Sequence, residues 1–193
     1  MGKQYQKLSP RYIEFIKQQQ LFFVGTAAAT GKVNISPKGG DSLRVLGPNQ
    51  VLWLNATGSG NETSAHIQQL PRMTLMFCAF EAAPVILRLY GTAKVIHKTD
   101  QQWSEYIELF PASISARQLY VLDIELVQSS CGTVVPLFDY VADRTEMDDW
   151  IEKKGADGIE HYWLEKNQHS IDGFASNIKQ LQGLDENEEK SGS

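Results

Sequence analysis

The chain reads VLWLNATGSGNETSAHIQQLPRMTLMFCAF from Val51 to Phe80. This pattern predicts a strand, a turn of small and polar residues, a short helix and a second strand. The turn at 57–61 contains two glycines, whose backbone can adopt angles closed to other residues and lets an anion approach the main chain closely. The helix is expected from Glu62 to Leu70, because Pro71 cannot continue it. These elements form the centre of the predicted fold.

The start of this helix has the composition of a phosphate-binding site. A helix N-terminus presents unpaired N–H groups and partial positive charge. Thr63 and Ser64 would add hydroxyl donors at the same place. The alternative is an ordinary capped turn, in which Asn61 serves as the N-cap. The turn alone leaves both interpretations open.

The composition indicates one compact domain with an acidic tail. The chain has 193 residues, 42% of them apolar, which is enough to bury a core. The formal net charge is −5; four acids and one lysine in 183–193 contribute −3 of it, which leaves −2 for the rest. We therefore expect a single domain over 1–182 and a disordered tail over 183–193. A near-neutral body without a basic stripe also argues against nucleic acid as a partner.

Nothing in the sequence indicates export, membrane insertion or a metal centre. The N-terminal segment lacks the apolar core of a secretory signal, and no run approaches the roughly 18 apolar residues that cross a bilayer. Cys78 and Cys131 have no partner spacing, which argues against both a disulfide framework and a zinc site. We expect a cytoplasmic protein that has no metal ligands and does not act at a membrane.

The segments on either side of the opening stretch predict an antiparallel β protein. Ser9 is a candidate N-cap for a helix from Pro10 to about Gln20, and another helix is expected from 99–100 to about Phe110. Strands are expected in a hairpin over 21–37 and at 42–46, 51–56, 73–80, 85–96 and 118–130. Six or seven strands with helices inserted between them favour a mainly β, α+β barrel over a doubly wound sheet. Gly91 within a long strand predicts a bulge or bend.

A helical extension is expected over about 140–182, beyond a barrel core of about 21–130. Its helical spacing is interrupted at Gly155. The segment after the second helical piece has loop composition, yet it contains Ile171 and Phe174, which we expect to be buried anchors. Such a loop could cover part of a site or a partner subunit.

Four motifs that follow one another carry a resemblance to a known family. They are SPKGG (36–40), LWLNATGSGNETSAH (52–66), RMTLMF (72–77) and LRLYGTAKV (87–95). Together they resemble the FMN-binding split-barrel family related to pyridoxamine 5′-phosphate oxidase, and most closely a branch of pyridoxamine 5′-phosphate oxidase-like proteins without an assigned reaction. The resemblance covers about 21–130. It implies an antiparallel six-stranded split β-barrel with peripheral helices, which dimerises and holds FMN at the dimer interface.

The resemblance also implies a set of cofactor-binding residues. The second strand of the hairpin supplies phosphate or ring contacts, the end of the next motif's strand lies near the flavin, and the helix start follows it. Matched position by position, these residues are Ser36, Lys38, Asn55, Asn61, Glu62 and Thr63. The physical interpretation agrees, because Lys38 supplies positive charge and Thr63 a hydroxyl donor beside the helix N–H groups.

Arg88 stands in an otherwise apolar strand, where a buried guanidinium requires a partner. That partner is an acid such as Asp123 or Glu125, a carboxylate at the dimer interface, or the electron-rich pyrimidine edge of the flavin. In the last case the positive charge would favour reduced, anionic flavin. Arg88 is therefore included among the candidate cofactor contacts.

Departures from the pyridoxal phosphate-forming members shape the predicted function. Those enzymes carry an arginine at a place near Val33, an Arg-Lys pair where Thr63 and Ser64 stand, and a C-terminal signature of tryptophan and arginine that is absent here. Without these arginines a pyridoxine phosphate ester would bind weakly. We expect an FMN-dependent oxidoreductase that acts as a homodimer on an unidentified small-molecule substrate or electron donor, with no catalytic side chain assigned. The alternatives are a non-catalytic, redox-responsive flavin-binding module, and the same barrel binding the deazaflavin F420 or heme.

Overall fold

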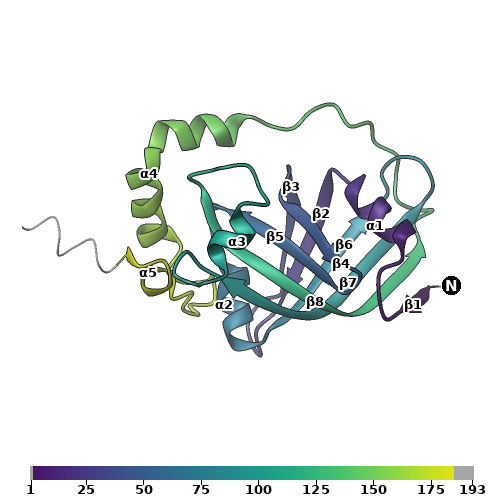
Figure 1. The fold of residues 1–193 in the computed structure, drawn as a ribbon, viewed down its shortest axis with the longest axis horizontal. Helices are drawn as coiled ribbons and strands as arrows, with labels where there is room; N and C mark the ends of the chain where they lie inside the picture. The colour runs from purple at the N-terminus through teal and green to yellow at the C-terminus, as the bar shows by residue number, and fades with distance from the viewer. Residues whose placement is uncertain (1, 185–193) are drawn as a thin grey trace, which may run out of the picture.

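The computed structural model describes residues 2–184 of the chain (Figure 1). Its strands are β1 (Lys3–Tyr5), β2 (Leu21–Thr26), β3 (Asn34–Gly39), β4 (Leu43–Gly47), β5 (Gln50–Ala56), β6 (Arg72–Cys78), β7 (Val85–Ile96) and β8 (Ala116–Cys131). Its helices are α1 (Pro10–Lys17), α2 (Glu62–Gln69), α3 (Trp103–Ile107), α4 (Glu146–Lys166) and α5 (Ile178–Leu181). The disordered acidic tail was predicted to begin at 183, but Leu184 is 6% exposed and packs with Ile159 and Trp163, so that boundary was too early. The rest of the predicted tail, from 185 onward, lies outside the described residues.

One antiparallel sheet curls around an apolar interior (Figure 1). Its order is β3-β2-β6-β7-β8-β5-β4, and β1 pairs with β8. The mainly β, split-barrel fold class predicted from the sequence is confirmed. Within residues 2–184 the sheet has eight strands, whereas the family resemblance implied six and the residue pattern six or seven. The difference includes β1, a polar segment of three residues with no apolar alternation to predict it.

Alternating side chains build the core of this sheet. In β2, half-buried and fully buried residues alternate along the strand, as expected when one face of a strand covers a core. The side chains with no exposed surface in the main cluster are Val24, Leu75, Leu87, Leu89 and Val127. Trp53 of β5 stacks on Tyr120 of β8, with ring centroids 4.8 Å apart. This aromatic pair closes the core on the side where the candidate site lies.

Gly91 marks a bulge between the two longest strands. The register of β7 against β8 shifts between Tyr90 and Gly91, which confirms the predicted irregularity. A side chain at this position would overlap the backbone carbonyl of Asp123. The glycine is therefore required by the close approach of the two backbones.

The predicted start was correct for α1 and wrong for α3. Ser9 caps α1, and its Oγ accepts a hydrogen bond from the N–H of Tyr12 at 3.4 Å, as predicted. The helix predicted from 99–100 to Phe110 was too long, because α3 begins only at Trp103. The carboxylate of Asp100 instead accepts from the backbone N–H of His97 at 2.8 Å, which keeps this stretch in a turn.

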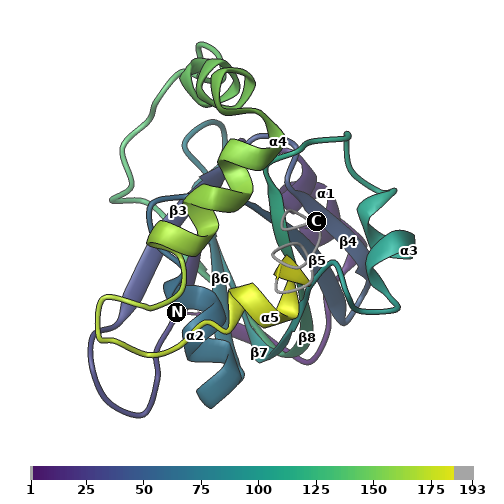
Figure 2. The same ribbon diagram turned by 90° about the vertical axis from the view of Figure 1, so that its left-hand side faces the viewer.

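The C-terminal extension packs against one end of the barrel (Figure 2). Gly155 has φ 65° and ψ 176°, so α4 bends there into two helical halves, at the interruption that the sequence predicted. Of the two predicted anchors, Ile171 is 71% exposed, so its predicted burial was wrong, whereas Phe174 is half-buried and its ring lies 6.4 Å from that of His66. Ile178 is the fully buried residue of this segment and packs with Ile159 and Trp163.

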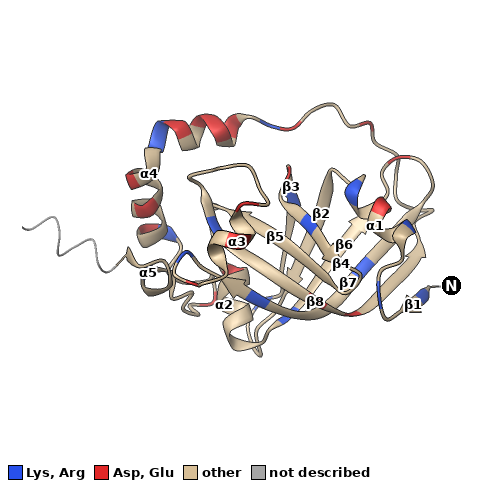
Figure 3. Cartoon of the chain, viewed as in Figure 1, with Lys and Arg blue, Asp and Glu red and all other residues tan. Residues whose placement is uncertain are grey.

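Acidic and basic side chains are distributed unevenly over the structure. Acidic side chains gather on α4, whereas lysines and arginines are scattered over the sheet (Figure 3). Within residues 2–184, no helix has the length and apolar character that crossing a bilayer requires.

Candidate ligand-binding site

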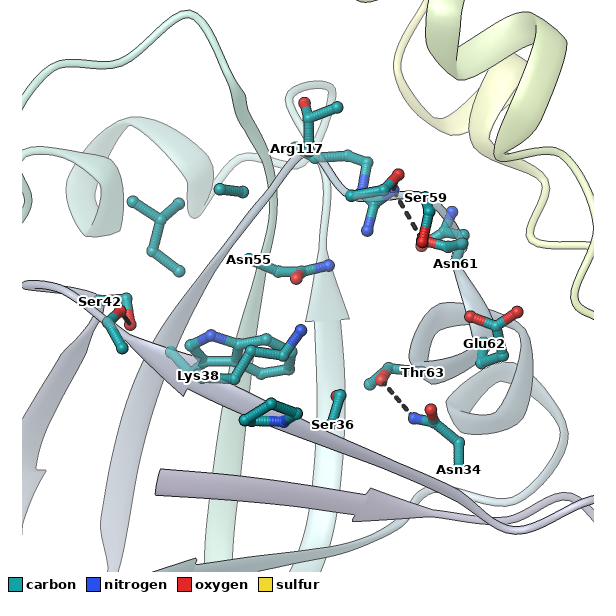
Figure 4. Close-up of a pocket in the computed structure, with 18 of the residues that line it drawn as sticks. Asn34, Ser36, Lys38, Ser42, Asn55, Ser59, Asn61, Glu62, Thr63 and Arg117 are labelled. Atoms are coloured by element: carbon teal, nitrogen blue, oxygen red, sulfur yellow. Dashed lines mark hydrogen bonds between the residues drawn. The ribbon is translucent and has the colours of Figure 1, made fainter. Parts of the chain in front are cut away.

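A cavity of about 590 Å³ opens between the end of β3, the end of β5 and the start of α2 (Figure 4). We refer to it as the polar groove. It brings together six of the seven candidate cofactor contacts, namely Ser36, Lys38, Asn55, Asn61, Glu62 and Thr63. Trp53, Asn34, Arg117 and the glycines of the 57–61 turn complete most of its lining.

Strand alternation explains why two of these residues share the groove. Ser36 and Lys38 are half-buried, whereas Ile35 and Pro37 between them are exposed. Successive side chains of a strand point to opposite faces, so a spacing of two places both polar groups on the groove side. Figure 4 shows both side chains directed toward the cavity.

Lys38 is a cation in a partly desolvated place. Its Nζ lies 5.0 Å from the ring centroid of Trp53. Burial, together with the nearby charge of Arg117, lowers the pKa of Lys38 from 10.5 to about 8, although Glu62 acts in the opposite direction. A positive charge that burial makes unfavourable is stabilised by an anion that binds beside it.

Arg117, at the start of β8, is a groove residue that the sequence analysis did not identify. It is 3% exposed. Its Nη1 donates to the carbonyl of Gly60 at 3.0 Å and to Oδ1 of Asn167 at 2.5 Å. Its buried Nε has no hydrogen-bond partner within residues 2–184, and burial lowers the pKa of the guanidinium to about 10. The residue remains charged at neutral pH, and no carboxylate of residues 2–184 forms an ion pair with it.

The signal for Arg117 in the sequence is weak. It is one polar residue at the start of an apolar, alternating strand, a pattern shared with many ordinary strand ends. The pairing of Asn55 on β5 with Gln118 on β8 brings the neighbouring Arg117 to the glycine turn. That pairing joins segments more than 60 residues apart, which no local pattern reveals.

Asn55 is held in one orientation by its neighbours. Its Nδ2 donates to Oε1 of Gln118 at 3.2 Å, and the hydroxyl of Tyr120 donates to the same oxygen at 3.3 Å. The amide nitrogen of Asn55 is thus engaged from behind, and its carbonyl oxygen remains as the acceptor toward the groove. A ligand group that donates a hydrogen bond is complementary to it.

The start of α2 is not capped by its own N-terminal neighbour. The side chain of Asn61 makes no capping bond, so the interpretation of an ordinary capped turn was wrong. Its Nδ2 instead donates to the backbone carbonyl of Asn167 at 3.2 Å. Glu62 turns back over Gly60 and accepts from the N–H of Ile171 at 3.3 Å. The helix N-terminus therefore keeps N–H groups that a ligand anion could engage.

The C-terminal extension secures the glycine turn from outside. Asn167 has no exposed surface, and its Nδ2 donates to the carbonyl of Gly58 at 3.1 Å. Trp163 donates from its indole N–H to the hydroxyl of Thr57 at 2.8 Å. The groove's turn thus depends on residues that follow the barrel by more than 30 positions.

Arg88 does not join the polar groove. It lines a separate cavity on the outer face of β6 and β7, where it is half-buried and donates to the hydroxyl of Ser130 at 3.2 Å. In the described part of the chain it forms no ion pair with Asp123 or Glu125, the acids considered from the sequence. Its role as a cofactor contact stays a prediction.

Comparisons with known proteins point to one family. The family model described as pyridoxamine 5′-phosphate oxidase matches residues 8–131. The pyridoxamine 5′-phosphate oxidase family protein ustO of Aspergillus flavus is 40% identical over 144 residues, which cover 72% of this chain and 58% of that protein. The chain therefore spans somewhat more than half the length of this curated relative.

Solved structures share the fold at low sequence identity. A Lactobacillus delbrueckii protein has a TM-score of 0.52 at 22% identity, over 64% of this chain and 94% of that one. HupZ of Group A Streptococcus has a TM-score of 0.50 at 19% identity, over 62% of this chain and 91% of that one. At these identities the likeness concerns the fold alone.

Proposed function

The chain belongs to the pyridoxamine 5′-phosphate oxidase family, and from this premise we propose that the polar groove binds FMN. The observation that carries the proposal is the presence in the groove of a half-buried cation, Lys38, and a buried one, Arg117, beside the uncapped start of α2. Arg117 is 3% exposed and its Nε has no hydrogen-bond partner within residues 2–184. The charge of Glu62 acts on Arg117, but no ion pair joins the two in the described residues, so a phosphate group could bond the free Nε. The residues present therefore fit the phosphate end of FMN.

The remaining groove residues suit the rest of the cofactor. Thr63 accepts from Asn34 at 3.2 Å, so its own hydroxyl proton is available for a phosphate oxygen. The carbonyl oxygen of Asn55 suits a ribityl hydroxyl or a ring N–H. Ser36 adds a second hydroxyl on the β3 side. FMN, when bound, supplies hydride or electron transfer, and these side chains bind and orient it.

We propose that the protein is an oxidoreductase on a small molecule other than a pyridoxine phosphate ester. Such an ester needs arginines for its own phosphate. Near Val33, where the pyridoxal phosphate-forming members carry one, the structure has an exposed apolar side chain. Thr63 and Ser64 stand where those members carry an Arg-Lys pair, and both are buried.

A homodimer is part of the proposal. Val33 and Ile35 are 70% and 67% exposed on the outer face of the sheet, next to the cavity that holds Arg88. A second copy of the chain would cover this apolar surface. Arg88 would then lie in the interface, where its guanidinium could pair with a carboxylate or with the flavin of the second copy. Light scattering of the purified protein measures the state directly, and a monomer at micromolar concentration would contradict the dimer.

The alternative cofactors fit the groove less well. Heme calls for an axial side chain such as histidine, and none of the residues that line the groove is a histidine. F420 carries a longer anionic tail than FMN, which calls for more positive charge than Lys38 and Arg117 provide. A non-catalytic flavin module uses the same groove, so it is distinguished by chemistry: rapid reduction of the bound flavin by NAD(P)H would argue against it.

The test of the proposal is a binding titration with two ligands. Quenching of flavin fluorescence by the full chain is measured for FMN and for riboflavin, which lacks the phosphate. We expect FMN to bind more tightly, and Lys38→Met to remove most of that difference. Lys94→Met serves as the matched control, because Lys94 is an exposed lysine of β7 that bonds Gln102. Failure to bind FMN at micromolar concentration would overturn the proposal.

A further inference from the structure

A second cavity of about 730 Å³ adjoins the polar groove. We refer to it as the aromatic cleft. Its lining consists of Thr57, Gly58, Ser59, Arg144, Glu146, Met147, Trp150 and Tyr162. Four of these, Thr57, Gly58, Ser59 and Met147, also line the polar groove. The two cavities therefore meet across the glycine turn, and a molecule in the cleft would lie next to a ligand in the groove.

The bend of α4 creates the cleft. Gly155, with φ 65°, turns the first helical half away from the direction of the second (Figure 1). Trp150 comes from the first half and Tyr162 from the second, and their rings meet edge to face with centroids 5.2 Å apart. Because L-residues with side chains rarely adopt this backbone conformation, the glycine is what allows the two aromatic rings to meet.

The surface of the cleft is mainly apolar, and the charges of its lining residues sum to zero. Trp150, Tyr162 and Met147 offer two aromatic rings and a polarisable thioether, which favour contact with another ring. Gly58 adds open space to the lining, because apart from its chain neighbours no atom lies within 4 Å of where its Cβ would stand. The two charged lining residues, Arg144 and Glu146, are exposed and form an ion pair at 3.5 Å, so their charges largely offset each other. Nζ of Lys154 lies 5.9 Å from the ring centroid of Trp150, but this lysine is exposed, so water screens its charge.

We propose that the aromatic cleft binds a neutral, planar aromatic molecule of one or two rings. The cavity volume lies within the range of small-molecule sites, and stacking rings without a net charge select against an ionised ligand. The role of this molecule as the substrate beside the flavin rests on the proposed function. Binding to the cleft itself does not.

A pair of fluorescent probes tests the proposal. 2-Naphthol is a planar two-ring molecule that is neutral at pH 7, and 6-hydroxynaphthalene-2-sulfonate is the same ring system with one negative charge. With the full chain we expect saturable binding of one neutral probe per chain, several-fold tighter than the anionic probe. Trp150→Ala should weaken the neutral probe roughly tenfold, since it removes both contact area and ring stacking.

Two further variants keep the test decisive. Trp103→Ala removes a half-buried tryptophan of α3 that does not line the cleft, so probe affinity should be unchanged. Met147→Ser changes a residue that is 44% exposed, so it can be tested even if Trp150→Ala unfolds; we expect a loss of several-fold. If wild type, Trp150→Ala and Met147→Ser bind the neutral probe with equal affinity, the proposal is overturned. A preference of wild type for the anionic probe would overturn it as well.

The same titrations separate this proposal from FMN binding. If FMN does not bind but Trp150→Ala still weakens the neutral probe, the cleft stands as a ligand site and the proposed function fails. If FMN binds normally and the affinity of the neutral probe is the same for wild type and for Trp150→Ala, only the cleft proposal fails. FMN affinity in Trp150→Ala should stay within about threefold of wild type, because Trp150 does not line the polar groove.

Discussion

The titration of Lys38 predicts how FMN affinity depends on pH. The pKa of its ammonium group is lowered to about 8 in the ligand-free protein, mainly by burial. The charged fraction is then about 0.9 at pH 7 and about 0.1 at pH 9. The phosphate of FMN is already dianionic over this range, since its second pKa is near ~6. Above pH 8 the protein must therefore take up a proton to bind the anion, and affinity should fall up to about tenfold between pH 7 and pH 9.

Fluorescence titrations of FMN at pH 7, 8 and 9, at constant ionic strength, measure this slope. Lys38→Met should bind more weakly at pH 7 and show little dependence on pH, whereas Lys94→Met should follow wild type. Riboflavin lacks the phosphate, so its affinity should change much less. An FMN affinity that stays within twofold from pH 7 to pH 9 would refute the reasoning, and so would an unchanged slope in Lys38→Met.

The stability of the ligand-free protein should move in the opposite direction. Because the folded-state pKa of Lys38 lies below its usual 10.5, the unfolded chain binds more protons at this residue between the two values. Stability from this group is therefore gained as pH rises above 8 and lost as pH falls through it. Urea unfolding of wild type relative to Lys38→Met should show a gain of about 1 kcal/mol between pH 7 and pH 9. A difference that does not change with pH would show that the lysine is not desolvated.

Three substitutions test the scaffold, each by urea unfolding. Gly91→Ala should destabilise by about 1–3 kcal/mol, because the added Cβ overlaps the carbonyl of Asp123; unchanged stability would mean that the bulge relaxes freely. Asn167→Leu should destabilise by about 2–4 kcal/mol, since it leaves buried groups, including Nη1 of Arg117, without this partner; FMN affinity should fall with it, and normal affinity would argue against a role in holding the turn. Trp163→Phe keeps an aromatic ring but removes the pyrrole part of a fully buried indole together with its hydrogen bond of 2.8 Å, so a loss of about 2–3 kcal/mol is expected, and a neutral result would show that repacking and water compensate for both.

Local patterns determined a large part of this protein. Apolar alternation predicted the strands, and Ser9 predicted the start of α1, because caps and strand faces depend on residues only a few positions apart. The family resemblance grouped Ser36 with Lys38, and the structure places them together because residues two apart on a strand share a face. The bulge at Gly91 followed from the glycine itself.

The tertiary structure decided the rest of the candidate site. Arg117 reaches the glycine turn only through the register of β8 against β5, and Asn61 is drawn from its capping position by Asn167, which lies 106 residues away. Arg88, which the sequence grouped with the cofactor contacts, lies in a different cavity, because its strand presents it to the outer face. Pairing between distant segments and the desolvation of charge depend on the whole packed chain. The sequence alone therefore determined the strands other than β1, and the packing of distant segments decided which charges meet.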